Sequence, residues 1–194
     1  MRLAGTIADL RSDLRRFAVD RKAISAVEFA LILPFMVFTY VGSAELGDGM
    51  AIYYKVTETA RTVTDLASQY VTIDPTTMGN ILGASAQVVA PFSSANMVVT
   101  LSQVNPTNAS GQGTIAWSCS LNGTARTYNS TVTLPTSLQT ESGVSIIWGE
   151  VTYPYTPAMG YAIAGTISLY QSIYFYPRLS NAVALTSTPA YCNS

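Results

Sequence analysis

The pattern of apolar residues in the first third of the chain predicts one long helix that begins with a membrane span. Residues 23–44 are apolar apart from small hydroxyl side chains and one carboxylate, Glu28. About 20 apolar residues in a helix are enough to cross a hydrocarbon core of about 30 Å. Apolar positions then recur every three or four residues from Ile52 to Tyr70. We therefore expect a helix from Ala23 to about Tyr70, with Pro34 as a point of bending.

Beyond Asp74 the pattern predicts a small head of mixed structure. Pro75 suits the start of a second helix, which should stop before Pro91. Asn122-Gly123 signals a short turn between two strands. No helix separates the expected strands, so the sheet should be antiparallel and the fold class α+β. The strands expected from alternation and composition are Met97–Gln103, Thr114–Leu121, Tyr128–Thr133, Val144–Tyr153 and Thr166–Tyr174.

The distribution of charged and apolar residues divides the chain into four parts and predicts its orientation across the membrane. Six of the ten basic residues precede the apolar segment, so the positive-inside rule places the N-terminus in the cytoplasm and the head across the membrane. We expect a basic amphipathic leader over 1–22, a single span over 23–44, a helical stalk over 45–74 and the head over 75–194. A secretory signal peptide cleaved after Ala44 is the alternative, but the long basic region and Glu28 count against it.

The residues around Glu28 resemble a known signature. Ala26-Val27-Glu28-Phe29-Ala30-Leu31, Leu33-Pro34, Gly42 and Glu45-Leu46-Gly47 are similar to the N-terminus of TadE/TadG-like proteins. These are pseudopilin-like components of the tight-adherence (Tad) pilus, a branch of type IV pili. The resemblance covers roughly residues 15–70 and implies a pilin-like fold, with the long helix carrying the head.

The same resemblance implies a function. It predicts a minor pilin-like component of the bacterial inner membrane that supports pilus biogenesis and surface adhesion, with a head that is periplasmic or carried into the pilus. Its partners would be the membrane and other Tad components: pilins, pseudopilins and platform proteins. Glu28 would serve assembly by neutralising a neighbour's N-terminal amine. The alternative is a single-pass, membrane-anchored periplasmic binding domain that never enters a filament, and such a domain could dispense with Glu28.

The resemblance also raises the question of processing by a prepilin peptidase. Such enzymes cut just before a segment with Glu at its fifth position, which places the cut between Ala23 and Ile24. Gly is expected before the cut, and this chain has Ala23. An active site that requires close backbone approach favours Gly over Ala. We therefore expect the leader to be retained; a mature chain that begins at Ile24 is the alternative.

Two cysteines fit the predicted location of the head. Cys119 lies in an expected strand and Cys192 near the C-terminus, and the chain has no His. Two thiols without His cannot complete a four-ligand zinc site. On the oxidising side of a membrane they can pair, so we expect a Cys119–Cys192 disulfide that fixes the C-terminal tail. Two unrelated thiols are the alternative.

The sequence offers little catalytic chemistry. Without His, the Ser-His and Cys-His arrangements are excluded, and no cofactor motif, metal site or small-molecule site is expected. Glu141 and Glu150 could form an acid pair, but nothing brings them together. The chain beyond residue 27 has an excess of acidic groups, which argues against a nucleic-acid partner.

The head is rich in aromatic residues, and most of them should pack a core. The segment that holds Tyr153, Tyr155 and Pro157 is the candidate interaction surface. Its prolines disfavour a continued central strand.

Overall fold

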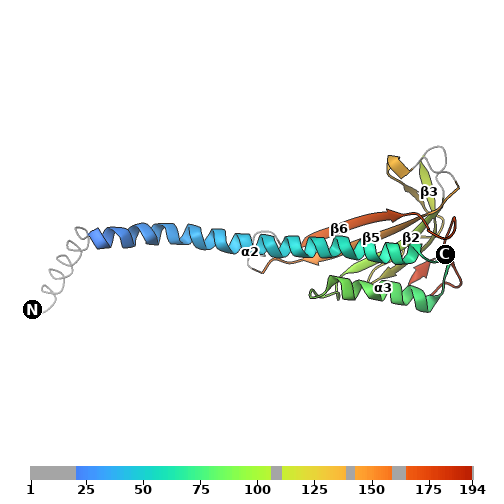
Figure 1. The fold of residues 1–194 in the computed structure, drawn as a ribbon, viewed down its shortest axis with the longest axis horizontal. Helices are drawn as coiled ribbons and strands as arrows, with labels where there is room; N and C mark the ends of the chain where they lie inside the picture. The colour runs from blue at the N-terminus through green and yellow to red at the C-terminus, as the bar shows by residue number, and fades with distance from the viewer. Residues whose placement is uncertain (1–20, 106–110, 139–142, 159–164, 194) are drawn as a thin grey trace, which may run out of the picture. The chain divides into compact units, whose positions relative to one another are not determined.

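The computed structural model describes residues 21–105, 111–138, 143–158 and 165–193 (Figure 1). The chain forms two compact units, residues 1–47 and 48–194, and one helix, α2 (Arg21–Ser68), contributes to both. Hydrogen bonds from the N–H of Gln69 to Leu66 and from that of Tyr70 to Ala67 tighten its last turn. The predicted long helix is therefore confirmed and ends two residues earlier than expected.

The second unit is an α+β domain, as the sequence predicts. Its second helix, α3 (Pro75–Val89), has the expected bounds. Asp74 caps it: one carboxylate oxygen accepts from the N–H groups of Thr76 and Thr77, at 2.9 and 3.1 Å, and the other from the Thr77 hydroxyl at 2.7 Å. These bonds, the Thr77 hydroxyl first, hold the pKa of Asp74 below its ordinary value. Pro75 follows at the first helical position, where its missing N–H costs nothing.

The strands form a six-stranded antiparallel sheet and a separate two-stranded parallel pair. The main sheet has the order β4-β3-β2-β5-β6, and the short β8 also pairs with β3. The parallel pair joins β1 to β7. The bounds are β1 (Thr72–Ile73), β2 (Val98–Asn105), β3 (Gln112–Leu121), β4 (Thr131–Thr133), β5 (Ile146–Tyr155), β6 (Ile167–Phe175), β7 (Ala184–Leu185) and β8 (Cys192–Asn193).

The connection at Asn122-Gly123 differs from the expected short hairpin. Asn122 does turn the chain, with φ of 56°, and its side-chain amide donates to the carbonyl of Met97 at 3.0 Å. However, β4 pairs with the start of β3, where Gln112 faces Thr133, rather than with its end. The edge at the end of β3 is occupied by β8, so the chain after Asn122 has to run back along the sheet before β4 can pair.

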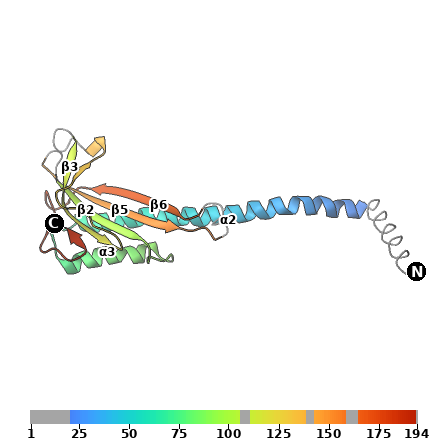
Figure 2. The same ribbon diagram turned by 180° about the vertical axis from the view of Figure 1, so that it is seen from behind.

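One face of the sheet carries both helices. In Figure 1 the residue 48–68 part of α2 passes in front of the strands, and in Figure 2 the strands pass in front of it. The pairing register places alternate residues of β2, β3 and β5 on this face, where they meet apolar side chains of both helices. The core contains Ile52, Val56, Ala60, Val63, Ala67, Met78, Ile81, Leu82, Val99, Leu101, Trp117, Cys119, Ile147 and Val151.

Close contact between α2 and the sheet depends on a glycine in β5. A Cβ added at Gly149 would overlap the Thr64 hydroxyl and lie 3.3 Å from the carbonyl oxygen of Ala60. Thr64 is fully buried, and its hydroxyl donates to that carbonyl at 2.5 Å. Backbone and a bonded side chain have little room to move, so only glycine allows the helix to lie this close to the strand.

We expect Gly149→Ala to lower the free energy of unfolding by about 1–3 kcal/mol, because the added methyl group overpacks the contact between α2 and β5. Gly83→Ala is the matched control: Gly83 lies inside α3 with open space at its Cβ position, so Ala there should stabilise by up to about 1 kcal/mol. Urea unfolding of the full chain in detergent, followed by tryptophan fluorescence, measures both. Equal stability of Gly149→Ala and the wild type would show that the contact is not close.

Candidate functional site

The most distinctive surface of the first unit is an uninterrupted apolar helix. The described side chains from residue 24 to residue 40 are all exposed, up to 76% for Phe38 and Tyr40. By length and composition this part of α2 can cross a membrane, and none of its most apolar window is buried inside the protein. Soluble proteins rarely leave such a continuous apolar surface in water. The segment is therefore either a membrane anchor or a signal sequence.

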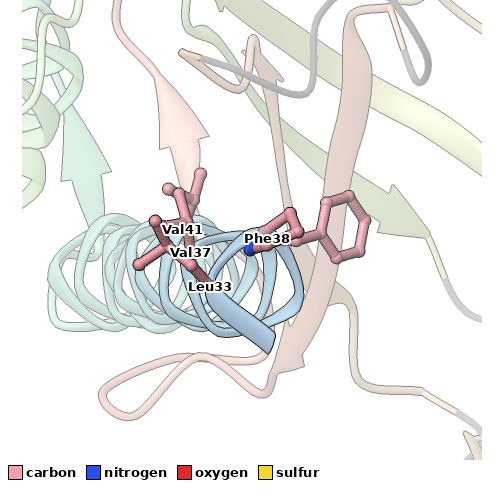
Figure 3. Close-up of a pocket in the computed structure, with 5 residues that line it drawn as sticks. Leu33, Val37, Phe38 and Val41 are labelled. Carbon is pink, nitrogen blue, oxygen red and sulfur yellow. The ribbon is translucent and has the colours of Figure 1, made fainter. Parts of the chain in front are cut away.

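A shallow apolar groove surrounds the helical proline of this segment. Its lining is Leu33, Pro34, Val37, Phe38 and Val41. Figure 3 shows Leu33, Val37 and Val41 along one side of the helix, with Phe38 pointing away from them. Pro34 has no N–H to donate to the carbonyl one turn earlier, and in a membrane such a break is better tolerated than in water.

The structure places the predicted assembly residues in this same segment. Glu28 lies inside the apolar part of α2, with its side chain exposed. Ala23 and Ile24, which flank the predicted cleavage point, are also in α2, and the side chain of Ile24 is 49% exposed. Pairing by Glu28 and cleavage before Ile24 both remain predictions. The leader falls mainly on residues 1–20, which lie outside the described residues.

A disulfide joins Cys119 to Cys192, as the sequence predicts. Both residues are buried and face each other where β8 pairs with β3. The bond spans 73 residues of sequence, and closing a loop of that length stabilises by about 4 kcal/mol in the chain-entropy model. Next to it, the Tyr191 hydroxyl donates to the carbonyl of Pro75 at 2.7 Å. The C-terminal tail is thus fixed to both the sheet and α3.

The opposite face of the sheet holds a charged and aromatic cluster that the sequence analysis missed. The Arg126 guanidinium donates two hydrogen bonds to the Glu150 carboxylate, both at 2.8 Å, and lies 4.0 Å from the ring centre of Trp148. The Tyr174 ring stacks on Trp148 at 5.6 Å. The Tyr170 hydroxyl donates to Glu150 at 2.7 Å. Arg126 is far from these strands in sequence, so only the fold brings the five residues together.

Hydroxyl groups complete this opposite face. Thr100 pairs with Ser120 and Ser102 with Ser118, each at 2.9 Å between hydroxyl oxygens. The Ser118 hydroxyl also accepts from the N–H of Arg126 at 3.0 Å, which fixes the loop after β3 against the sheet. All four hydroxyl residues are buried. Alternation of Ser and Thr with apolar residues in these two strands was the available signal for a polar face opposite the helices.

The cluster changes the ionisation of two of its members. The bonds to Glu150 hold the pKa of Arg126 above its ordinary value. Burial, and then the bond to Glu150, raise the pKa of Tyr170 to about 12. The Glu150 carboxylate accepts from both Arg126 and Tyr170. Glu141, its suggested partner in an acid pair, lies outside the described residues.

The strand β5 extends two residues beyond the end expected at Tyr153. β5 continues through Pro154 to Tyr155, which pairs with Ile167 of β6. β2 ends its pairing with β5 at Thr152, so only β6 pairs with the strand at Pro154 and the strand is no longer central there. Tyr153 and Tyr155 are partly buried against the core, and Pro157 is buried. Whether these three residues form an interaction surface stays a prediction.

The exposed apolar part of α2 is the principal candidate site. Among the described residues, no group of three or more His, Cys, Asp or Glu side chains could hold a metal ion. Comparison with protein-family models, with curated proteins and with solved structures gives no match to this chain. The class that the structure itself defines is an α+β protein whose long N-terminal helix begins with an apolar, membrane-spanning-type segment.

We expect the stability of the head to fall as the pH rises from about 10 to about 12. The pKa of Tyr170 is about 12 in the folded protein, against an ordinary value of 10.0. Between these two values the tyrosine ionises in the unfolded chain but not in the folded one, which favours unfolding. The contribution of Tyr170 to the free energy of unfolding is therefore complete below pH 10 and is lost as the pH rises to about 12. Tyr170→Phe should remove this part of the pH dependence. Tyr128→Phe, which removes an exposed hydroxyl, should leave it in place. Urea midpoints measured across this pH range test the pair; identical pH profiles for wild type and Tyr170→Phe would contradict the assignment.

Proposed function

We propose that this chain is a minor pilin-like component of Tad pilus assembly that supports pilus biogenesis and surface adhesion and has no catalytic role. The observation that carries the proposal is the exposed apolar segment of α2 with a single carboxylate, Glu28, inside it. The resemblance of the residues around Glu28 to TadE/TadG-like proteins supports the same reading. In this proposal residues 23–44 cross the inner membrane, the N-terminus is cytoplasmic and the head is periplasmic or carried into the pilus.

Insertion is energetically favourable in spite of Glu28. Ten Ile, Leu, Phe or Val residues lie between Ile24 and Val41. At the centre of a span each contributes about −0.3 to −0.6 kcal/mol, or about −3 to −6 kcal/mol together, whereas one central acidic residue costs about 2.5–3.5 kcal/mol. Glu28 lies near the start of the segment, where the cost is smaller. The carboxylate therefore does not prevent insertion, and a role in assembly explains its presence inside an apolar surface.

The head has features that are typical of a domain located outside the cytoplasm. Its Cys119–Cys192 disulfide requires an oxidising compartment to form and persist. Three of the four basic residues beyond the apolar segment, Lys55, Arg126 and Arg178, are each paired with a carboxylate: Glu58, Glu150 and Asp65 respectively. These features support a structural or binding role for the head, on the side of the membrane opposite the basic leader.

We expect Glu28→Gln to leave membrane insertion intact and to reduce piliation and surface attachment. A polar contact between helices in lipid contributes about 0.6–2 kcal/mol, so losing the charge should weaken each subunit contact by about 3- to 30-fold. Glu58→Gln is the matched control, because Glu58 is an exposed carboxylate in the same helix. Pilus counts by electron microscopy and an attachment assay on cells with equal protein levels measure the effect.

Normal piliation in Glu28→Gln cells would contradict the assembly role. A chain that still fractionates with the membrane would then fit the other interpretation, an anchored periplasmic binding domain outside the filament. Loss of piliation in the Glu58→Gln control as well would show that the effect is not specific to the charge inside the span.

A further inference from the structure

One end of the head's sheet lies beside Gly49, a residue of α2 shortly after the apolar segment. A Cβ at Gly49 would lie 3.3 Å from the ring of Tyr155, the last residue of β5. Tyr155 pairs with Ile167, the first residue of β6. We call this end, defined by Gly49, Met50, Tyr155 and Ile167, the base of the head. Ile146, at the start of β5, marks the other end of the sheet.

The base has the chemistry of a surface that lies at a membrane interface. Residues 151–177 contain no Asp, Glu, Lys or Arg. Several large apolar or aromatic side chains at or just above the base are exposed: Met50 by 50%, Tyr53 by 46%, Tyr54 by 65% and Ile167 by 42%. Tyrosine is enriched where bilayers meet water, because its ring is apolar and its hydroxyl is polar. A surface that mixes such rings with aliphatic side chains suits the headgroup layer.

The chain also keeps the base close to the bilayer. Five residue steps lead from Ala44, the end of the predicted span, to Gly49. In α2 they rise about 8 Å, and even a fully extended chain of five residues reaches only about 18 Å. The headgroup region extends about 5–8 Å beyond the hydrocarbon core on each side. The base therefore reaches this region in the helical state, and the tether prevents it from moving far away at any orientation of the two units.

We propose that the base of the head rests in the headgroup layer of the membrane that α2 crosses, with Met50 and Ile167 at the interface. This inference depends on the proposed function, because it requires residues 23–44 to span the membrane. The contact is apolar and aromatic rather than ionic, since three of the four basic residues beyond residue 44 are already paired. It should therefore depend little on anionic lipid or on salt.

A second copy of the chain is the competing occupant of the same surface. The tether favours lipid, because every inserted copy has headgroups within reach of its base, whereas a neighbouring subunit is present only after assembly. The strands bring no charge to the base, and the exposed Asp48 beside Gly49 is a single carboxylate, so the base offers no pattern of complementary charges that would select one protein partner.

Tryptophan probes in vesicles test the contact. The full-length variant Ile167→Trp is reconstituted in phosphatidylcholine vesicles, with and without bromine near the top of one acyl chain. The matched control is Tyr128→Trp, which replaces a 57%-exposed aromatic residue next to Asn129. The N–H of Asn129 donates to the carbonyl of Ile115. Ile115 and Ile146 both pair with Val104, so the control lies beside Ile146, at the start of β5. The base is at the other end of β5, nine residues or about 30 Å away. Wild-type spectra supply the background from the two buried native tryptophans.

We expect brominated lipid to quench the added emission of Ile167→Trp, to leave that of Tyr128→Trp unchanged, and to act equally when phosphatidylglycerol is included. Met50→Trp, on α2, gives a second readout if the strand variant folds poorly. Unquenched emission from both base variants in vesicles that hold the chain would overturn the inference and leave the proposed function standing. Emission that changes only with protein density would assign the base to a second copy and also overturn it. A chain that fails to float with the vesicles would overturn both.

Discussion

The apolar surface of residues 24–44 must be kept away from water, and this constraint shapes the whole protein. The side chains here are almost all exposed, and the described part of the chain offers nothing that covers them. A soluble helix buries one stripe and exposes a polar face, whereas this segment is apolar on all sides. A bilayer satisfies the constraint, because a helix bonds its own backbone and lipid accepts its side chains. Glu28 is the conspicuous exception, and this is why it is the best candidate for a functional group.

The same helix changes character within the head. From Ile52 to Ala67 its buried positions recur every three or four residues and pack on the sheet, while Lys55, Glu58 and Arg61 face solvent or half-exposed surroundings. Gly149 allows the close approach on one face of the sheet. On the other face, Arg126 is held between Glu150 and Trp148. Together with the Cys119–Cys192 bond, these contacts fix the structure of the domain.

Local patterns predicted the elements that carry strong local signals. The long helix, the start of α3 at Pro75 and the five main strands follow from periodicity and capping, which act within a few residues. The disulfide was predictable because there are only two cysteines. In contrast, β1, β7 and β8 are two residues long and exist because distant segments meet: the Trp117 indole donates to the carbonyl of Val183, and Cys192 is bonded to Cys119. No local pattern could reveal them.

The errors have the same origin. Asn122-Gly123 has the composition of a hairpin turn, but β8 takes the pairing edge that a hairpin would need. The strand expected to end at Tyr153 continues to Tyr155, because β2 stops at Thr152 and Pro154 no longer lies in a central strand. The cluster around Glu150 draws on Arg126, Trp148 and Tyr170, which only the strand register brings together. Sequence patterns therefore located the apolar helix and Glu28, but not the polar face of the head.

The most direct test of the account is the topology of the full chain in cells. Single cysteines introduced as Ser12→Cys in the leader and Tyr128→Cys in the head can be labelled with a membrane-impermeant thiol reagent, since the native pair is oxidised. In intact spheroplasts we expect label only on Tyr128→Cys, with Ser12→Cys labelled after lysis, and both proteins in the carbonate-washed membrane fraction. Label on Ser12→Cys in intact spheroplasts, or release of the chain by carbonate, would contradict a single span with the head outside the cytoplasm.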